Sequence, residues 1–76
     1  MKKVKISLDS IQAVKEFVGI VMMYDFDVDL TSGRYAVDAK SIMGIFSLDL
    51  SKPIDLEAHT DDADKFFKDI DKFIVK

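Results

Sequence analysis

The stretch AKSIMGIFSLDLSKPIDLEA, residues 39–58, carries the signals for a helix, a loop and a strand in succession. Ser41 stands directly before apolar residues at helical spacing. Serine is a preferred helix cap because its hydroxyl accepts a hydrogen bond from a free backbone N–H of the first turn. Ser51-Lys52-Pro53 ends the loop after the short helix. Residues 54–58 then alternate between apolar and polar, as in a strand with one buried face. The stretch therefore predicts a short helix followed by a strand.

The same alternation predicts three further strands on the N-terminal side of this stretch. Residues 3–8 alternate, with apolar side chains at the even positions. Residues 26–30 and 35–39 also alternate, and they flank Ser32-Gly33. Because glycine supplies the positive φ that a tight turn needs, these two segments are predicted to form a β-hairpin.

A first long helix is predicted between the first strand and the hairpin. Asp9 or Ser10 can cap a helix that starts at Ile11 and ends near Met23. Its apolar stripe recurs at helical spacing and is expected to face the core. The stripe consists of Ile11, Val14, Val18 and Val21.

A last helix is predicted over residues 63–74, where a broad apolar stripe recurs at helical spacing. Thr60-Asp61-Asp62 precedes it, as expected of a cap and an acidic first turn. Two acid-first pairs at i,i+4 spacing are expected to support it, namely Asp61/Lys65 and Asp64/Lys68.

The element order is therefore strand, helix, strand, strand, helix, strand, helix. Each strand has one apolar and one polar side, so a single sheet is expected to carry all three helices on one face and to show its other face to water. The predicted class is α+β, a two-layer open-faced β-sandwich. Residues 1–76 are expected to form one domain, since a chain of this length reaches only one small core.

Composition excludes several classes of function. A net charge of −3 without a basic stripe argues against a nucleic-acid partner. The longest apolar run, residues 17–24, is too short to span a bilayer, so no membrane role is expected. The chain has no cysteine, which fits a reducing compartment. These features predict a soluble protein of the cytoplasm.

The order of elements, together with Lys40-Ser41-Ile42-Met43-Gly44 and Ser47-Leu48, resembles the HPr family of the bacterial sugar phosphotransferase system. The resemblance is greatest to the Gram-positive form, whose second helix opens with the same five residues. It implies an antiparallel sheet of order 1-4-2-3. The charges agree with that order, because opposite charges can then pair across neighbouring strands.

The sequence departs from the family pattern at the phosphohistidine. If Phe17-Val18 is matched to the Phe-Val of the family pattern, Ser10, Gln12 and Ala13 occupy the positions of its histidine, arginine and proline. A phosphoserine is an ordinary ester and cannot relay a phosphoryl group as a phosphohistidine does. The chain is therefore expected to have no catalytic residue and not to be an enzyme.

Ser41 is the candidate for regulatory phosphorylation. The resemblance implies that the matching serine is the target of HPr kinase and that its phosphate helps HPr bind a catabolite control protein. This role is compatible with helix capping, since a phosphate at a helix N-terminus is favoured by the helix dipole.

Met43, Phe46 and Ser47 are the candidates for partner binding. Helical spacing turns Ile42, Ile45 and Leu48 toward the sheet and leaves these candidates facing outward, in full or in part. Two interpretations remain open. The outward side chains form a docking surface for a protein partner, or they cover the seam with the first helix, where Phe17, Met22 and Met23 lie.

His59, the one histidine, is predicted to be a polar surface residue rather than a functional one. The acidic residues of the polar sheet face suggest a cation site, yet a solvated acidic face is favoured over one. This set consists of Asp25, Asp27, Asp29, Asp55 and Glu57. No zinc-ligand spacing and no glycine-rich phosphate loop is present, so neither metal nor cofactor is expected.

The resulting hypothesis is an HPr-like protein that does not relay phosphohistidine and acts as a regulatory or protein-binding relative through its second helix. Its expected partners are proteins, such as those of the phosphotransferase system or catabolite control. One alternative is a regulator phosphorylated on Ser41 in carbon-catabolite signalling. Another is a structural or self-associating module.

Overall fold

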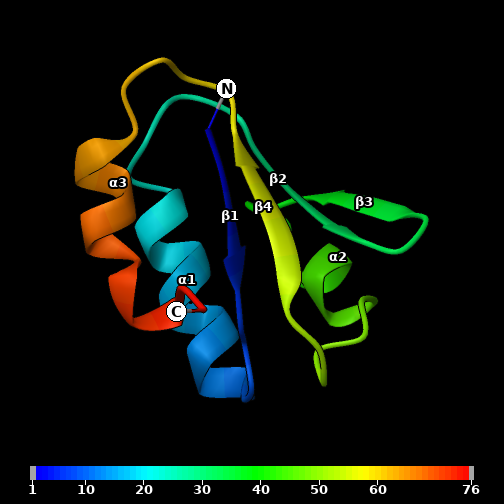
Figure 1. Cartoon of the computed structure of the whole chain (residues 1–76). Coiled ribbons are helices and arrows are strands. Elements are labelled where there is room, and N and C mark those ends of the chain that lie inside the picture. Colours follow the sequence, from blue (N-terminus) through cyan, green and yellow to red (C-terminus); the bar gives the residue numbers. More distant parts are fainter. Residues whose placement is uncertain (1, 76) are drawn as a thin grey trace.

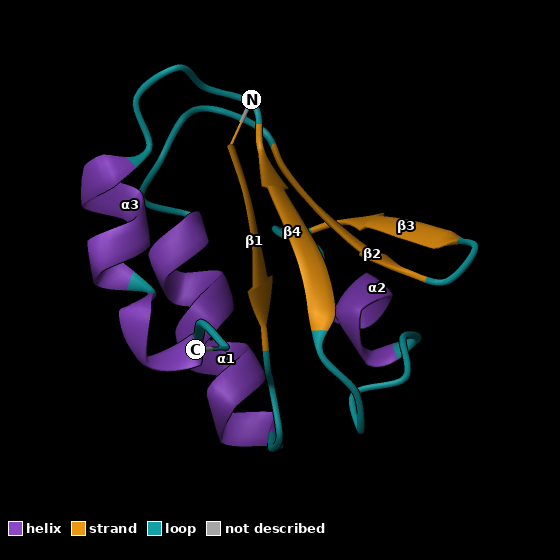
Figure 2. Ribbon diagram, viewed as in Figure 1, coloured by secondary structure: helices purple, strands orange, loops and turns teal. Residues whose placement is uncertain are grey.

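A computed structural model describes residues 2–75 as an antiparallel sheet with helices packed against it (Figure 1 and Figure 2). The four strands have the order β1-β4-β2-β3, which confirms the expected topology. In chain order the elements are β1 (Lys2–Ile6), α1 (Ile11–Val21), β2 (Val28–Ser32), β3 (Tyr35–Asp38), α2 (Ile42–Phe46), β4 (Ile54–Ala58), α3 (Asp64–Asp69) and a 3₁₀ turn (Asp71–Phe73).

The strands separate an apolar face from a charged face, as their alternation predicts. Leu30 of β2 lies opposite Leu56 of β4, and both are fully buried against the helices. On the other face, Lys3 Nζ lies 3.3 Å from Glu57 Oε2 and Lys5 Nζ lies 3.0 Å from Asp55 Oδ1. These ion pairs between β1 and β4 confirm the expected pairing of opposite charges across strands.

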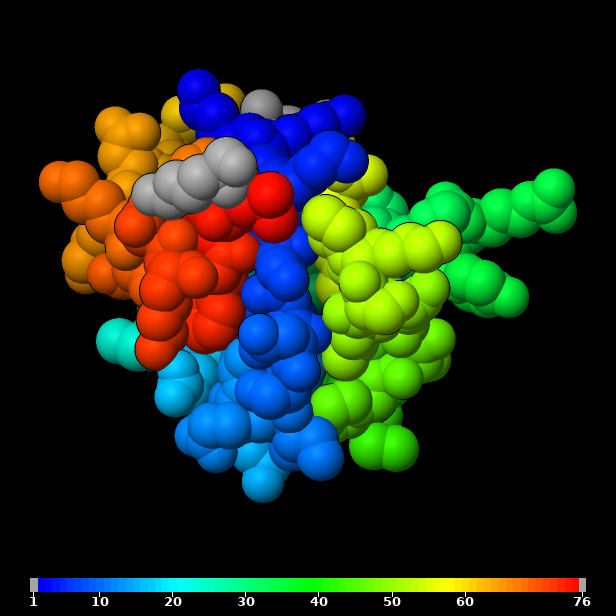
Figure 3. All heavy atoms as spheres, turned by 60° about the horizontal axis from the view of Figure 1, so that its bottom comes forward, coloured from blue at the N-terminus to red at the C-terminus, as the bar shows by residue number. Residues whose placement is uncertain are grey.

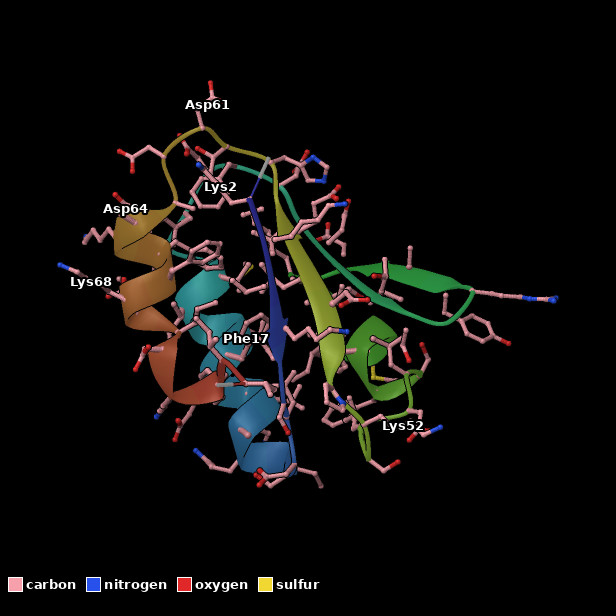
Figure 4. All side chains as sticks on the ribbon, in the orientation of Figure 1. Lys2, Phe17, Lys52, Asp61, Asp64 and Lys68 are labelled. Atoms are coloured by element: carbon pink, nitrogen blue, oxygen red, sulfur yellow. The ribbon has the colours of Figure 1, made fainter. Side chains whose placement is uncertain are left out.

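The core lies between the sheet and the helices. Figure 4 shows Phe17 of α1 pointing inward, whereas Lys68 of α3 points away from the molecule. The Phe17 ring meets Phe73 edge to face at a centroid distance of 5.8 Å, which joins α1 to the C-terminal 3₁₀ turn. Aromatic pairs favour this geometry. The largest fully buried side chains include Ile6, Leu8, Phe17, Leu30, Ile45, Ile54, Leu56, Phe66 and Ile70.

The hairpin begins later than the alternation predicts. β2 starts at Val28, and Phe26 lies in the preceding loop, where its ring packs 5.4 Å from that of Phe66. An aromatic cluster at the helix ends therefore holds Phe26, in place of a strand pairing. The turn also shifts by one residue, because Ser32 pairs with Tyr35 and leaves Gly33, with φ of 60°, as the first of the two turn residues.

Two strand ends also lie earlier than expected. β1 ends at Ile6, after which the Ser7 N–H donates to the Phe73 carbonyl over 2.8 Å. The C-terminal segment thus replaces a sheet strand beside this part of the chain. β3 ends at Asp38, and the Ala39 N–H donates to the Val28 carbonyl over 2.8 Å.

α1 begins as predicted but presents a different stripe to the core. Ser10 caps the helix, which ends at Val21, two residues before the expected end. Val14, Phe17 and Val21 are buried, whereas Ile11 is 64% exposed. Ile11 stands in the first turn, beyond the side chains that form the core. The prediction that it faces the core is therefore wrong.

α3 is shorter than predicted. It starts at Asp64 with Ala63 at its cap position, and a 3₁₀ turn follows it. Thr60 does not cap the helix: its Oγ1 accepts a hydrogen bond from the Asp62 N–H over 3.3 Å, within the preceding loop. Asp61 lies outside the helix, so the Asp61/Lys65 pair does not have the helical spacing assumed for it. Within residues 2–75, the helices lack the length and apolarity that a bilayer crossing demands.

Candidate functional site

Ser41 lies at the start of α2, as the sequence predicts. Its backbone is extended, with φ of −99° and ψ of 101°, and its Oγ accepts a hydrogen bond from the Gly44 N–H over 3.2 Å. Asp38 supports this start, since its carbonyl accepts from the Ser41 N–H and its Oδ1 from the Lys40 N–H, each over 2.9 Å. The residue is exposed, so the capping hydroxyl stands at the surface.

Gly44 lies where α2 packs against Val37 of β3. A β-carbon added there would lie 3.2 Å from Ser41 Oγ and 3.3 Å from Val37 Cβ. Both distances are tight for carbon contacts, so a glycine permits the helix to approach the strand while the cap stays formed. At the other end of α2, Ser47 Oγ donates to the Gly44 carbonyl.

The outward side of α2 carries apolar side chains above a buried inner side. Ile45 and Leu48 are buried, whereas Met43 is 77% exposed and Phe46 is 39% exposed. Met22 and Met23 at the end of α1 are exposed too. Met43 and Phe46 therefore do not form a closed seam with the α1 methionines. α2 presents an apolar surface, with Ser47 exposed beside it.

Ser10 is confirmed as the cap of α1, because its Oγ accepts a hydrogen bond from the Ala13 N–H over 3.0 Å. Gln12 is exposed and bonds to Glu16, which also pairs with Lys72. The Lys72 hydrogen bond and charge, followed by the Gln12 bond, hold the pKa of Glu16 below its usual value. The start of α1 thus presents the Ser10 hydroxyl and the Gln12 amide, and the nearby Lys72 ammonium is already paired with Glu16.

The beginning of α1 and the end of α2 lie at the same end of the molecule. Figure 1 shows both near the bottom, and Figure 3, which brings the bottom forward, shows the first turn of α1 (blue) beside the segment after α2 (yellow-green). The two helices are in contact. Ile11 adds a further exposed apolar side chain there. Sequence reasoning missed it, although its place directly after the cap was the available signal.

His59 lies at the opposite end of the sheet, just beyond the end of β4. Its Nε2 is 2.8 Å from Asp29 Oδ2 on β2 and 3.6 Å from Glu57 Oε1 on β4. Because β4 ends near the top of Figure 1 and α1 begins near the bottom, this imidazole is remote from Ser10. The sequence placed His59 on the polar side of β4, as it did Glu57, but it did not give the β2–β4 register that brings Asp29 beside the imidazole.

The comparisons with known proteins agree with the fold. Residues 10–76 match the family model described as the PTS HPr component phosphorylation site. HPr-C-His from Thermoanaerobacter tengcongensis has a similar structure, with a TM-score of 0.79 and 28% identity over 95% of this chain and 89% of that one. The phosphocarrier protein HPr from Bacillus anthracis str. Ames gives a TM-score of 0.69 and 26% identity over 97% and 94%. No curated protein matches the chain significantly.

Proposed function

The chain belongs to the PTS HPr family, and from this membership we propose that it is a regulatory or protein-binding relative that does not relay a phosphoryl group through histidine. The proposal assigns partner binding to α2 and its surroundings. The expected partners are proteins of the phosphotransferase system or of catabolite control. The cytoplasm is the proposed compartment, and no enzymatic reaction is proposed.

The position of His59 is the observation that carries this proposal. A relay in this family needs an imidazole before the first helix, and here Ser10 caps that helix while the one histidine lies beyond β4. His59 is engaged with Asp29 and is not followed by an arginine. A serine hydroxyl can accept a phosphate, but the resulting ester lacks the transfer potential of a phosphoramidate. We therefore assign Ser10, Gln12 and Ala13 to the positions of the family's histidine, arginine and proline.

The exposed side of α2 supports the assignment of partner binding. Met43 and Phe46 present flexible and aromatic apolar surface, and Ser47 provides a hydroxyl next to them. Methionine side chains adapt to different partner surfaces because they are unbranched and polarizable. Ile45, which directly precedes Phe46 in sequence, is fully buried, so the helix is anchored while its outer side remains available.

A phosphotransfer assay tests the absence of a relay. The chain is incubated with Enzyme I and labelled phosphoenolpyruvate, with the Bacillus anthracis HPr as the positive control. We expect no acid-labile label on this chain under conditions that label the control. Label on His59 would contradict the proposal, and a His59→Gln variant would identify that residue as the acceptor.

A binding measurement tests the α2 surface. Titration of the ¹⁵N-labelled chain with Enzyme I or a catabolite control protein should shift amide signals of α2 and of the first turn of α1. Met43→Ser and Phe46→Ser should each weaken this binding. Met23→Ser is the matched control, since Met23 is equally exposed but lies at the other end of α1. Equal weakening by the control would contradict a specific role for α2.

A second candidate function is regulation by phosphorylation of Ser41. The observation in its favour is an exposed hydroxyl, held at the start of α2, within the same five residues as in the family. Treatment with HPr kinase and ATP should add one phosphate, and peptide mass spectrometry should place it on Ser41. Ser41→Ala should abolish the modification and Ser47→Ala should preserve it. An unmodified chain would contradict regulation through Ser41 and leave only the binding function.

A further inference from the structure

One imidazole and two carboxylates come together at the outer face of the β2–β4 pair. Asp29 of β2 lies directly opposite Glu57 of β4 in the strand register, and His59 follows Glu57 by two residues. One potential ligand atom from each of the three side chains lies within 4.8 Å of the other two. Asp29 and Glu57 are half-buried and His59 is exposed, with side-chain exposures of 44% for Asp29, 27% for Glu57 and 34% for His59.

Two of the three spacings are close to those in the ligand set of a small divalent ion. Zinc binds imidazole nitrogen and carboxylate oxygen at about 2.0–2.2 Å, so two ligand atoms of a tetrahedral site lie roughly 3.3–3.5 Å apart. The distances of 2.8 Å and 3.6 Å from His59 Nε2 to the two carboxylates lie on either side of this value. Small rotations of exposed side chains are enough to reach it. We propose that Asp29, Glu57 and His59 form a binding site for a zinc-like transition-metal ion.

The backbone holds these three residues together without the ion. Asp29 and Glu57 are paired within the β2–β4 ladder, and the His59 N–H donates to the Asp27 carbonyl over 2.9 Å. Lys3 lies 3.3 Å from Glu57 Oε2, while Oε1, the other oxygen of this carboxylate, faces His59. Such an outer partner orients a ligating carboxylate and partly offsets the negative charge of the pair. The site is therefore largely preorganised by the sheet.

A shallow depression of about 450 Å³ on the charged sheet face lies beside these residues, and Asp29 and Glu57 form part of its lining. Three protein ligands leave at least one position of a tetrahedral ion for water, and the depression provides space for it. The imidazole distinguishes this group from the solvated acidic face that the sequence predicts. Carboxylates alone suit calcium or magnesium, whereas a histidine nitrogen favours zinc and its neighbours in the periodic table.

Zinc titration of the full chain, with any affinity tag removed, tests the proposal. The chain has one histidine, so its imidazole signals in a long-range ¹H–¹⁵N spectrum are assigned without ambiguity. We expect zinc chloride to shift the His59 ring signals and to saturate at one equivalent in calorimetry. His59→Gln and Asp29→Asn should each weaken zinc binding by at least about tenfold, since even the loss of an outer-shell partner costs 10–100-fold.

Asp55→Asn is the matched control, because Asp55 lies on the same strand face but pairs with Lys5 and is not one of the three ligands. It should leave zinc affinity unchanged. Amide spectra verify that every variant is folded. The proposal is overturned if the His59 ring signals do not move at excess zinc, or if His59→Gln binds zinc as tightly as the natural chain. Equal weakening by Asp55→Asn would likewise overturn it, since this would indicate nonspecific attraction to the acidic face.

Discussion

The Gly44 N–H donates to Ser41 Oγ over 3.2 Å, and a β-carbon at Gly44 would stand 3.2 Å from the same oxygen. Ser41 and Gly44 thus form the hydrogen bond that caps α2, and Ser41 also limits the size of the side chain at position 44. The added carbon would also lie 3.3 Å from Val37 Cβ, which is attached directly to the β3 backbone. A β-carbon at this position therefore requires α2 or its two neighbours to shift by a few tenths of an ångström.

Gly44→Ala should destabilise the fold even though alanine favours helices. Crowding of a packed site costs about 1–3 kcal/mol, and the gain in helix propensity offsets about 0.5–1 kcal/mol of it. We expect a net loss of about 1 kcal/mol in the free energy of unfolding, measured by urea denaturation. Gly19→Ala is the control, since nothing lies within 4 Å of its added carbon, and it should stabilise the fold. Stabilisation by both variants would contradict the close approach.

Ser41→Ala should lower the free energy of unfolding by about 1 kcal/mol, because the first turn of α2 loses its cap. Ser41→Asp should retain most of the stability, since a carboxylate also accepts the Gly44 N–H. Ser10→Ala should cost a similar amount at α1, where Ser10 Oγ accepts from Ala13. Urea denaturation checks all three variants. No loss in Ser41→Ala would show that the capping bond contributes little in solution.

Ile45→Ala and Met43→Ala should differ sharply although the two residues stand two positions apart. Ile45 is fully buried, so its truncation leaves a cavity and should cost about 2–5 kcal/mol. Met43 is 77% exposed, and its truncation should change the free energy of unfolding by less than about 0.5 kcal/mol. Comparable losses in thermal or urea denaturation would mean that Met43 is covered in solution.

Tyr24 should make the fold sensitive to alkaline pH. Its hydroxyl donates to Asp69, and this hydrogen bond, with burial and the negative charge of Asp69, raises the pKa of Tyr24 to about 12. The folded state then holds the phenol proton more tightly than the unfolded chain, whose tyrosines titrate near pH 10. The stability that this contact contributes is fully present below about pH 10 and is lost as the pH rises toward 12.

Urea midpoints measured between about pH 9 and about pH 12 check this prediction. Tyr24→Phe should lose less stability over that range than the natural chain. Tyr35→Phe is the control, because Tyr35 is 70% exposed, and deprotonation of lysines affects both variants equally. The same pH dependence in both variants would contradict the role of the Tyr24–Asp69 contact.

Local patterns of the sequence determined the element order, the two faces of the sheet and the two serine caps. Alternation assigns each strand residue to one face whatever its partner, and a serine before a helical run acts within a few residues of itself. Ser10 and Ser41 therefore lie where the sequence predicts. The sheet order came from the resemblance carried by Lys40-Ser41-Ile42-Met43-Gly44, and the structure confirms it.

Only the tertiary structure determined which residues depart from these local patterns and which distant residues come together. Phe26 keeps the alternation of a strand but packs on Phe66, and Ile11 keeps the helical period but stands beyond the core. The grouping of Asp29 with His59 depends on the register between β2 and β4, strands that are distant in the chain. Periodicity describes neighbours along the sequence, whereas these contacts are set by how the sheet and helices pack on each other. The candidate metal ligands could therefore be recognised only in the folded chain.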